Sequence, residues 1–293
     1  MSYRAPVKDM LFAIKELADI DAVAALPGFE EAGYDTIALS DHVVHPETVK
    51  TKYPYTKDGS LRWEPFTDWP DPWVSVGAMA AVTSRVRFVT GVYVLPLRNP
   101  FVVAKAVGTA AAISNDRLTL GIGTGWMKDE FDLLEQPFER RGKRTDEMIE
   151  VLRELWSGGM VEHHGEFYDF DRLEMSPVPS QPVPIVVGGL SERALRRAAM
   201  LGDGWFSDLH TTDELRGYLA KLRAYRADSP RASEPMQVLV SCMDAFDRDA
   251  YRRLEDIGVT HLVTKPWLFH GGTEGDLASK IEGLKRFADA QLR

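Results

Sequence analysis

The chain has 293 residues, 44% of them apolar and 27% charged, so a sizeable folded core is expected and bulk disorder is excluded. Its 35 Lys and Arg residues against 44 Asp and Glu give a net charge of −9, which argues against a general nucleic-acid binder. The single cysteine, Cys242, excludes an internal disulfide framework and a cysteine-cluster zinc site, and no apolar run reaches the roughly 18 residues of a membrane span.

Short apolar runs alternate with longer amphipathic stretches along the whole chain. The runs predict buried strands at Met10–Ile14, Thr36–Leu39, Val86–Val94, Leu118–Ile122, Ile185–Val187, Gly204–Phe206, Met236–Val240 and His261–Val263. Strands that alternate with helices pair in parallel, and continuously apolar strands are buried on both faces. Eight such units in under 300 residues predict a single-domain (β/α)8 TIM barrel over residues 1–293 with insertion segments, and an open doubly wound sheet is the alternative.

Several helices between the strands have readable ends. Asn99 followed by Pro100 predicts a helix start, with Asn99 as N-cap. Thr211 with Glu214 three residues later resembles a capping box. The segment Leu190–Leu201 places its apolar residues on one helical face, and Gly202 is the predicted C-cap.

Two segments interrupt the alternation. Pro46–Pro72 is long, proline-rich and aromatic, which is typical of a lid or binding loop, although an insertion packed on the barrel flank is the alternative. The second segment is Met160–Pro184. A predicted turn at His163–Gly165 is flanked there by Val161–Glu162 and Phe167–Asp169, which indicates a short hairpin with solvated histidines.

Chemically capable residues follow the predicted strands, at the end of a parallel barrel where functional loops gather. The second strand is followed by Asp41 and His42, and an imidazole there can exchange a proton near neutral pH or be held by a backbone carbonyl. In the third strand Gly91 interrupts a β-branched run before Val92, which indicates a bulge, close approach of a ligand, or tight packing.

The fourth and fifth strands end in glycines. Gly123, Thr124 and Gly125 leave room for a flat ring beside the backbone, with Trp126 as its wall, and neither a dinucleotide fingerprint nor a P-loop is present. After Val187, the pair Gly188–Gly189 leads into a helix at Ser191, which favours either a phosphate site or a simple left-handed connection with Ser191 as N-cap.

In their order and spacing, these strand ends resemble the bacterial-luciferase-like family of flavin- and deazaflavin-dependent oxidoreductases. The landmarks are Gly33–Asp35, Ser40–His42, Leu95–Pro100, Gly121–Trp126, Glu130–Phe131, Arg141–Gly142, Glu147, Leu155–Trp156, Gly165–Tyr168, Val187–Gly189 and Gly202–Trp205. The tract from Trp126 to Trp156 is typical of the branch that uses coenzyme F420.

The resemblance implies a barrel whose cofactor lies across the carboxyl-terminal mouth. His42 is then the expected catalytic residue, and Gly91–Val92 matches a bulge, often a non-proline cis peptide, that supports the ring. The expected cofactor-binding residues are Asp41, Gly91, Val92, Gly123, Thr124, Gly125, Val187, Gly188, Gly189 and Ser191. F420-dependent sugar-phosphate dehydrogenases have a glutamate where this chain has Trp126, so that substrate is not expected.

We therefore expect an enzyme that uses F420 to transfer hydride to or from a small, apolar or aromatic organic substrate, with Trp126, Trp63 and Trp69 as substrate contacts. The alternatives are an FMN-dependent monooxygenase, a non-catalytic flavin- or deazaflavin-binding protein, and a metal-dependent barrel hydrolase, although no metal-ligand set assembles around His42 and His45. No nucleic-acid or membrane partner is expected, and the resemblance implies a homodimer. No secretion signal is visible before Met10, so the expected location is the cytoplasm.

Overall fold

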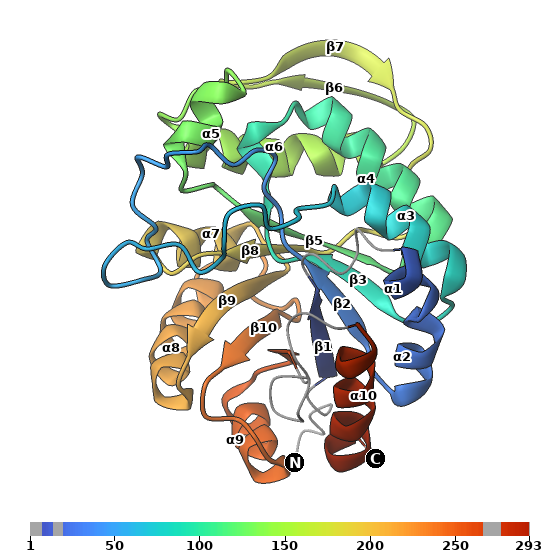
Figure 1. The fold of residues 1–293 in the computed structure, drawn as a ribbon. Helices are drawn as coiled ribbons and strands as arrows, with labels where there is room; N and C mark the ends of the chain where they lie inside the picture. The colour runs from blue at the N-terminus through green and yellow to red at the C-terminus, as the bar shows by residue number, and fades with distance from the viewer. Residues whose placement is uncertain (1–7, 14–19, 266–276, 293) are drawn as a thin grey trace.

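A closed parallel barrel forms the centre of the molecule, for which the computed structural model describes residues 8–13, 20–265 and 277–292. Its strands are β1 (Lys8–Ala13), β2 (Thr36–Leu39), β3 (Arg87–Thr90), β5 (Leu118–Gly123), β8 (Ile185–Gly188), β9 (Gly204–His210), β10 (Gln237–Cys242) and β11 (His261–Thr264). All neighbouring pairs are parallel, β1 pairs with both β2 and β11, and β3 pairs with β5, which closes the ring (Figure 1). The predicted eight-stranded barrel is confirmed.

Each predicted strand has a counterpart, but several ends differ, most of all in β9, which was predicted over Gly204–Phe206 and continues to His210. The first strand was predicted to end at Ile14, a position that lies outside the described residues. The third, predicted as one strand over Val86–Val94, is interrupted at Gly91–Val92, where the peptide bond is cis, as the resemblance implied. Beyond the interruption, the short strand β4 (Tyr93–Val94) pairs with the last residues of β5.

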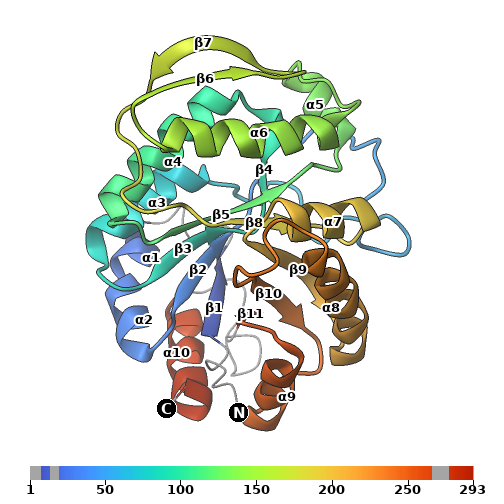
Figure 2. The same cartoon turned by 180° about the vertical axis from the view of Figure 1, so that it is seen from behind.

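Helices surround the barrel (Figures 1 and 2). They are α1 (Ile20–Ala24), α2 (Leu26–Ala32), α3 (Pro72–Val82), the 3₁₀ turn η2 (Leu95–Leu97), α4 (Pro100–Ser114), α5 (Lys128–Leu133), α6 (Arg141–Trp156), α7 (Glu192–Met200), α8 (Thr212–Ala227), α9 (Arg248–Ile257), α10 (Leu277–Phe287) and the π-helical turn η4 (Ala288–Leu292).

The helix-start predictions are confirmed, whereas one helix-end prediction is wrong. Asn99 accepts a hydrogen bond from the amide of Phe101, and Thr211 forms a reciprocal capping box with Glu214. Helix α7 has Leu201 as its C-cap, in a right-handed conformation, so Gly202 is not the cap. Glycine is needed at 202 because a Cβ there would lie 2.8 Å from the carbonyl oxygen of Ala198.

Two apolar layers form most of the core of the described residues, beside a smaller cluster of Val94, Leu97 and Phe131. One lies between barrel and helices and contains the outward side chains of the strands, such as Ile37, Phe88 and Trp205. The other fills the barrel interior and consists of Ala38, Val89, Val186, Phe206, Leu239 and Val263, with Val92 packed against it. The alternation of side chains along each strand separates the two layers, and the filled interior leaves ligands to bind at the ends of the barrel.

The two predicted insertions take different positions. Residues 43–71, here called the lid segment, contain no helix or strand. The hairpin, formed by β6 (Met160–His164) and β7 (Asp169–Glu174), lies outside α6 (Figures 1 and 2). Its two histidines belong to β6 rather than to a turn. The His163 side chain is 10% exposed and its Nδ1 lies 2.9 Å from Oε2 of Glu154, so it is not solvated as predicted, whereas the His164 side chain is 60% exposed.

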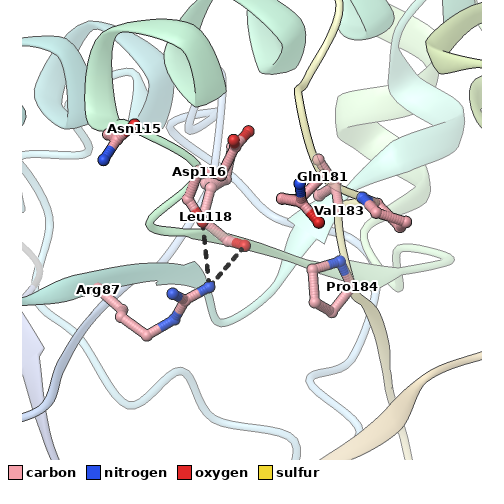
Figure 3. A pocket seen from close by; sticks show the side chains of 8 residues that line it. Arg87, Asn115, Asp116, Leu118, Gln181, Val183 and Pro184 are labelled. Carbon is pink, nitrogen blue, oxygen red and sulfur yellow. Dashed lines mark hydrogen bonds between the residues drawn. The ribbon is translucent and has the colours of Figure 1, made fainter.

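A hollow of about 330 Å³ lies at the amino-terminal end of the barrel (Figure 3). Its lining comes from the residues at the starts of β3, β5 and β8: Arg87, Asn115, Asp116, Leu118, Gln181, Pro182, Val183 and Pro184. Nη2 of Arg87 donates to the carbonyl oxygens of Asp116 and Leu118 there. Because parallel barrels carry their chemistry at the opposite end, the carboxyl-terminal mouth is where the functional site is expected.

Candidate active site

The first residue of the site, Asp41, is buried and ion-paired. Its Oδ2 accepts hydrogen bonds from Nη1 of Arg98 at 2.6 Å and from the amide of Val94 at 2.9 Å, and its Oδ1 accepts from Nη2 of Arg98 at 2.7 Å. Burial alone would lower the pKa of Arg98, but the Asp41 carboxylate outweighs burial and raises it. Asp41 thus links the loop after β2 to β4 through its bond with Val94. A contact of Asp41 with a cofactor stays a prediction.

The next residue, His42, is held from α5. Its side chain is 9% exposed, and Nδ1 lies 3.1 Å from Oε2 of Glu130, whose side chain is 2% exposed. The other carboxylate oxygen, Oε1, accepts from the amides of Val43 at 2.6 Å and Val44 at 3.4 Å. Burial alone would raise the pKa of Glu130, but the bonds from His42 and the two amides lower it below the ordinary 4.5. Glu130 is therefore ionised at neutral pH.

Aromatic side chains surround the His42 ring. Its centroid lies 4.8 Å from that of Trp69, 5.3 Å from Trp63 and 6.2 Å from Trp126, and Tyr53 packs edge-on against Trp63 and Trp126. We call Tyr53, Trp63, Trp69 and Trp126 the aromatic box. Burial, reinforced by Asp208, raises the pKa of Tyr53 to about 12, so its phenol is neutral at physiological pH.

The lid segment is fastened across the mouth at two points besides the bonds of Val43 and Val44 with Glu130. Near its start, the amide and hydroxyl of Thr51 donate to Oδ2 of Asp129 on α5 at 3.1 and 2.7 Å. Near its middle, Nη1 of Arg62 donates to both carboxylate oxygens of Asp208 on β9 at 2.9 and 2.8 Å. The second pair is partly exposed, with side-chain exposures of 38% and 30%. The insertion therefore covers the mouth and not the barrel flank.

Tight packing explains the glycines beneath the aromatic box. A Cβ on Gly91 would lie 2.6 Å from the ring of Phe206, and one on Gly123 or Gly188 would lie 2.7 Å from a methyl of Val92. The space at Gly123 and Gly188 thus holds Val92. This side chain takes the room that Gly123 was expected to leave for a flat ring and Gly188 for a phosphate. Together Val92 and Phe206 cover the top of the barrel interior and give the mouth an apolar floor.

Thr124 and Gly125 continue this floor at the end of β5. Both are partly exposed, whereas every residue of β5 is buried. Gly125 has a φ of +77°, and its carbonyl oxygen accepts a hydrogen bond from Nε of Arg141 at 2.9 Å. A side chain at 125 would meet Phe131 at 2.6 Å, so glycine is required here by conformation and by space.

Beyond β8 the chain enters α7 through Gly189, which has a φ of +116°. Ser191 is the N-cap, and its hydroxyl accepts from the amide of Ala194 at 3.2 Å. The Val187 side chain is buried in the layer between barrel and helices, so it offers only its backbone to the mouth. At the exposed start of α7, the amides of Glu192 and Arg193 make no hydrogen bond with any described residue, and such free amides suit an anion.

The mouth thus brings together His42, the aromatic box, the glycine-containing floor and the start of α7. Asp41 is bound to Arg98 instead, and the Val187 side chain packs in the layer between barrel and helices. Sequence reasoning did not assign Glu130, Phe206 or Asp208 to the site. Glu130 was visible only as a landmark of the resemblance, because it is 88 positions from His42 in the chain. Within the described ranges, no group of three or more His, Cys, Asp or Glu side chains is arranged to hold a metal ion.

A filled parallel barrel with a histidine and an apolar, lid-covered floor at its mouth defines an enzyme scaffold suited to a planar ligand. Residues 15–282 match the family described as luciferase-like monooxygenase, and the chain belongs to this family of oxidoreductases. No helix in the part of the chain that the structure describes is long and apolar enough to cross a membrane.

Relatives and solved structures agree with this placement. The chain is 40% identical over 263 residues to an uncharacterized protein of Mycobacterium tuberculosis (strain ATCC 25618 / H37Rv), covering 89% of this chain and 90% of that one. It is 32% identical over 255 residues to the F420-dependent glucose-6-phosphate dehydrogenase of Nakamurella multipartita, covering 84% and 68%. An F420-dependent secondary alcohol dehydrogenase in complex with an F420-acetone adduct shares the fold, with a TM-score of 0.73, 16% identity, and coverage of 97% and 98%.

Proposed function

We propose that this protein uses the deazaflavin coenzyme F420 to transfer hydride to or from a small, largely apolar organic substrate. The observation that carries the proposal is the placement of a buried, carboxylate-bound histidine and an aromatic box over an apolar floor at one barrel mouth. The similarity to the F420-dependent dehydrogenase of Nakamurella multipartita supports the choice of coenzyme.

The residues of the mouth fit a flat ring with a phosphorylated tail. Gly91, Val92, Thr124 and Gly125 are partly exposed, although the strands below them are buried, so they offer a surface to a ligand. Because Val92 and Phe206 close the barrel interior, this floor would hold a ring outside the barrel. The start of α7, with Gly189 and Ser191, would suit the phosphate. When bound, the coenzyme supplies the carbon that exchanges hydride.

His42 supplies the proton chemistry in this proposal. Nδ1 is engaged by Glu130, and Nε2 makes no hydrogen bond with any described residue, so Nε2 is the nitrogen open to a substrate oxygen. It accepts a proton from a substrate hydroxyl in one direction and returns a proton to a carbonyl oxygen in the other. The lid segment excludes water from the reacting groups while this occurs.

The aromatic box favours an apolar substrate over a sugar phosphate. Its four members present ring surface rather than charge. The resemblance to the F420 branch implies that sugar-phosphate dehydrogenases have a glutamate where this chain has Trp126. The indole N–H of Trp63 is buried without a hydrogen-bond partner among the described residues. A buried donor without a partner is unfavourable, and a substrate oxygen in the box would satisfy it.

A second candidate is an FMN-dependent monooxygenase. The chain is 32% identical over 189 residues to the pyrimidine monooxygenase RutA of Allorhizobium ampelinum, covering 61% of this chain and 51% of that one. The same floor would suit the ring of F420 or the ring of FMN. The two candidate enzymes differ in whether hydride transfer or oxygen chemistry follows. A third candidate, a carrier that binds the coenzyme without turnover, uses the same residues apart from His42.

Titration of the purified protein with F420 and with FMN, combined with mass spectrometry of any co-purifying coenzyme, separates these candidates. We expect tight binding of F420, and H42A should lose turnover by about 10²- to 10⁴-fold while it retains coenzyme affinity. Preferential binding of FMN with oxygen consumption would favour the monooxygenase. Unchanged behaviour of H42A in every redox assay would favour the carrier, and binding of neither coenzyme would refute the proposal.

A further inference from the structure

We propose that Glu130 is a positioning residue that holds the His42 ring in the Nδ1–H form and leaves Nε2 as its reactive nitrogen. The role assigned to Nε2 rests on the proposed function. The assignment of the protonated nitrogen stands on the local geometry alone.

The geometry of Glu130 divides its two oxygens between two tasks. Oε2 faces Nδ1 of His42 at 3.1 Å, and Oε1 is occupied by the amides of Val43 and Val44. A carboxylate only accepts hydrogen bonds, so the nitrogen that faces it carries a proton. In a neutral imidazole the other nitrogen, Nε2, is then unprotonated and able to accept a proton.

The surroundings make this arrangement specific to one ring orientation. Both side chains are almost fully buried, and the ring is packed against Trp63, Trp69 and Trp126, so it cannot rotate to offer Nε2 to the carboxylate without displacing indoles. The other nearby charge, Arg98, is paired with Asp41, so Glu130 remains the partner of His42.

The substitution E130Q tests the proposal because it inverts the hydrogen-bond pattern. The amides of Val43 and Val44 only donate, so the carboxamide oxygen of the new side chain takes the place of Oε1. Its NH₂ group then faces Nδ1, which must accept, and the ring proton moves to Nε2. The ring keeps its position but can no longer accept a proton from a substrate.

Nitrogen-15 NMR of protein labelled at histidine, recorded at alkaline pH where imidazoles are neutral, reads the tautomer directly, with H42Q providing the assignment. We expect the Nδ1–H form in the wild-type protein and the Nε2–H form in E130Q. An Nε2–H form in the wild-type protein would overturn the proposal even if E130Q did not fold. This readout needs neither coenzyme nor substrate, so failure of the proposed function is distinguishable from failure of this inference.

Kinetics provide the second readout. E130Q should lower kcat by about 10²- to 10⁴-fold with coenzyme affinity retained, because general base catalysis is lost. In an H42Q background the same substitution should cost nothing further, since Glu130 acts through His42. D132N is the matched control, because Asp132 is an exposed carboxylate of the same helix that pairs with Lys128, and its kcat should stay within about twofold. Equal losses from E130Q with and without His42 would refute the positioning role.

Discussion

The buried pair between Asp41 and Arg98 allows a quantitative test of how the mouth is held together. The substitution D41N removes the negative charge that pairs with Arg98 and leaves one acceptor oxygen for three donors. Loss of one member of a buried ion pair costs about 3–5 kcal/mol of the free energy of unfolding. Since the Arg98 side chain retains 16% exposure and thus some contact with water, we expect about 3 kcal/mol.

Equilibrium urea denaturation followed by tryptophan fluorescence measures this loss. D208N is the control, because Asp208 also pairs with an arginine but both side chains are partly exposed, and its loss should stay below about 1 kcal/mol. A loss for D41N no larger than that for D208N would refute the reasoning. Weakened coenzyme binding by D41N at unchanged stability would instead make Asp41 a ligand.

Three further perturbations address the floor, the lid segment and the acid limit of stability. G188A places a Cβ 2.7 Å from Val92, so it should displace the Val92 side chain. Coenzyme binding, measured by titration, should then weaken by about tenfold. An unchanged affinity would show that Val92 does not support the ring. D208A removes the partner of Arg62 and so loosens the lid segment over the tryptophans of the aromatic box. Acrylamide should then quench tryptophan fluorescence more strongly than in the wild-type protein. Equal quenching would mean that the ion pair does not fasten the lid segment. The pKa of Glu130 in the folded protein lies below 4.5, so the ionised carboxylate stabilises the fold fully above that pH and loses this effect as the pH falls through the folded pKa. E130Q should therefore flatten the decline of the urea midpoint below pH 4.5. An identical decline in E130Q and the wild-type protein would contradict this account.

The barrel was predictable from the chain alone because its signals are local. Continuous apolar runs define strands buried on both faces, and capping residues such as Asn99 and Thr211 mark where helices start. Eight repeats of this unit leave few alternatives, and the structure closes them into the predicted ring. The position of His42 at the mouth follows from the same logic, since it lies in the loop that follows strand β2.

The interruption at Gly91–Val92 shows a limit of local reasoning. The apolar run predicted one strand over Val86–Val94. Gly91 within it indicated a bulge, a ligand approach or tight packing, and only the resemblance pointed to a cis peptide there. Likewise, glycines at 123 and 188 were expected to make room for a ligand. They make room for Val92 instead, which lies in the interruption between β3 and β4.

The amino-acid sequence by itself determined the strands, the helix starts and the residues that follow each strand, because these depend on neighbours a few positions apart. Only the tertiary structure decided which of those residues meet. Glu130 binds His42 across 88 positions, Arg62 binds Asp208 across 146, and Asp41 is turned toward Arg98. Such contacts depend on how the closed barrel brings strand ends and the lid segment together, and no periodicity in the chain encodes them.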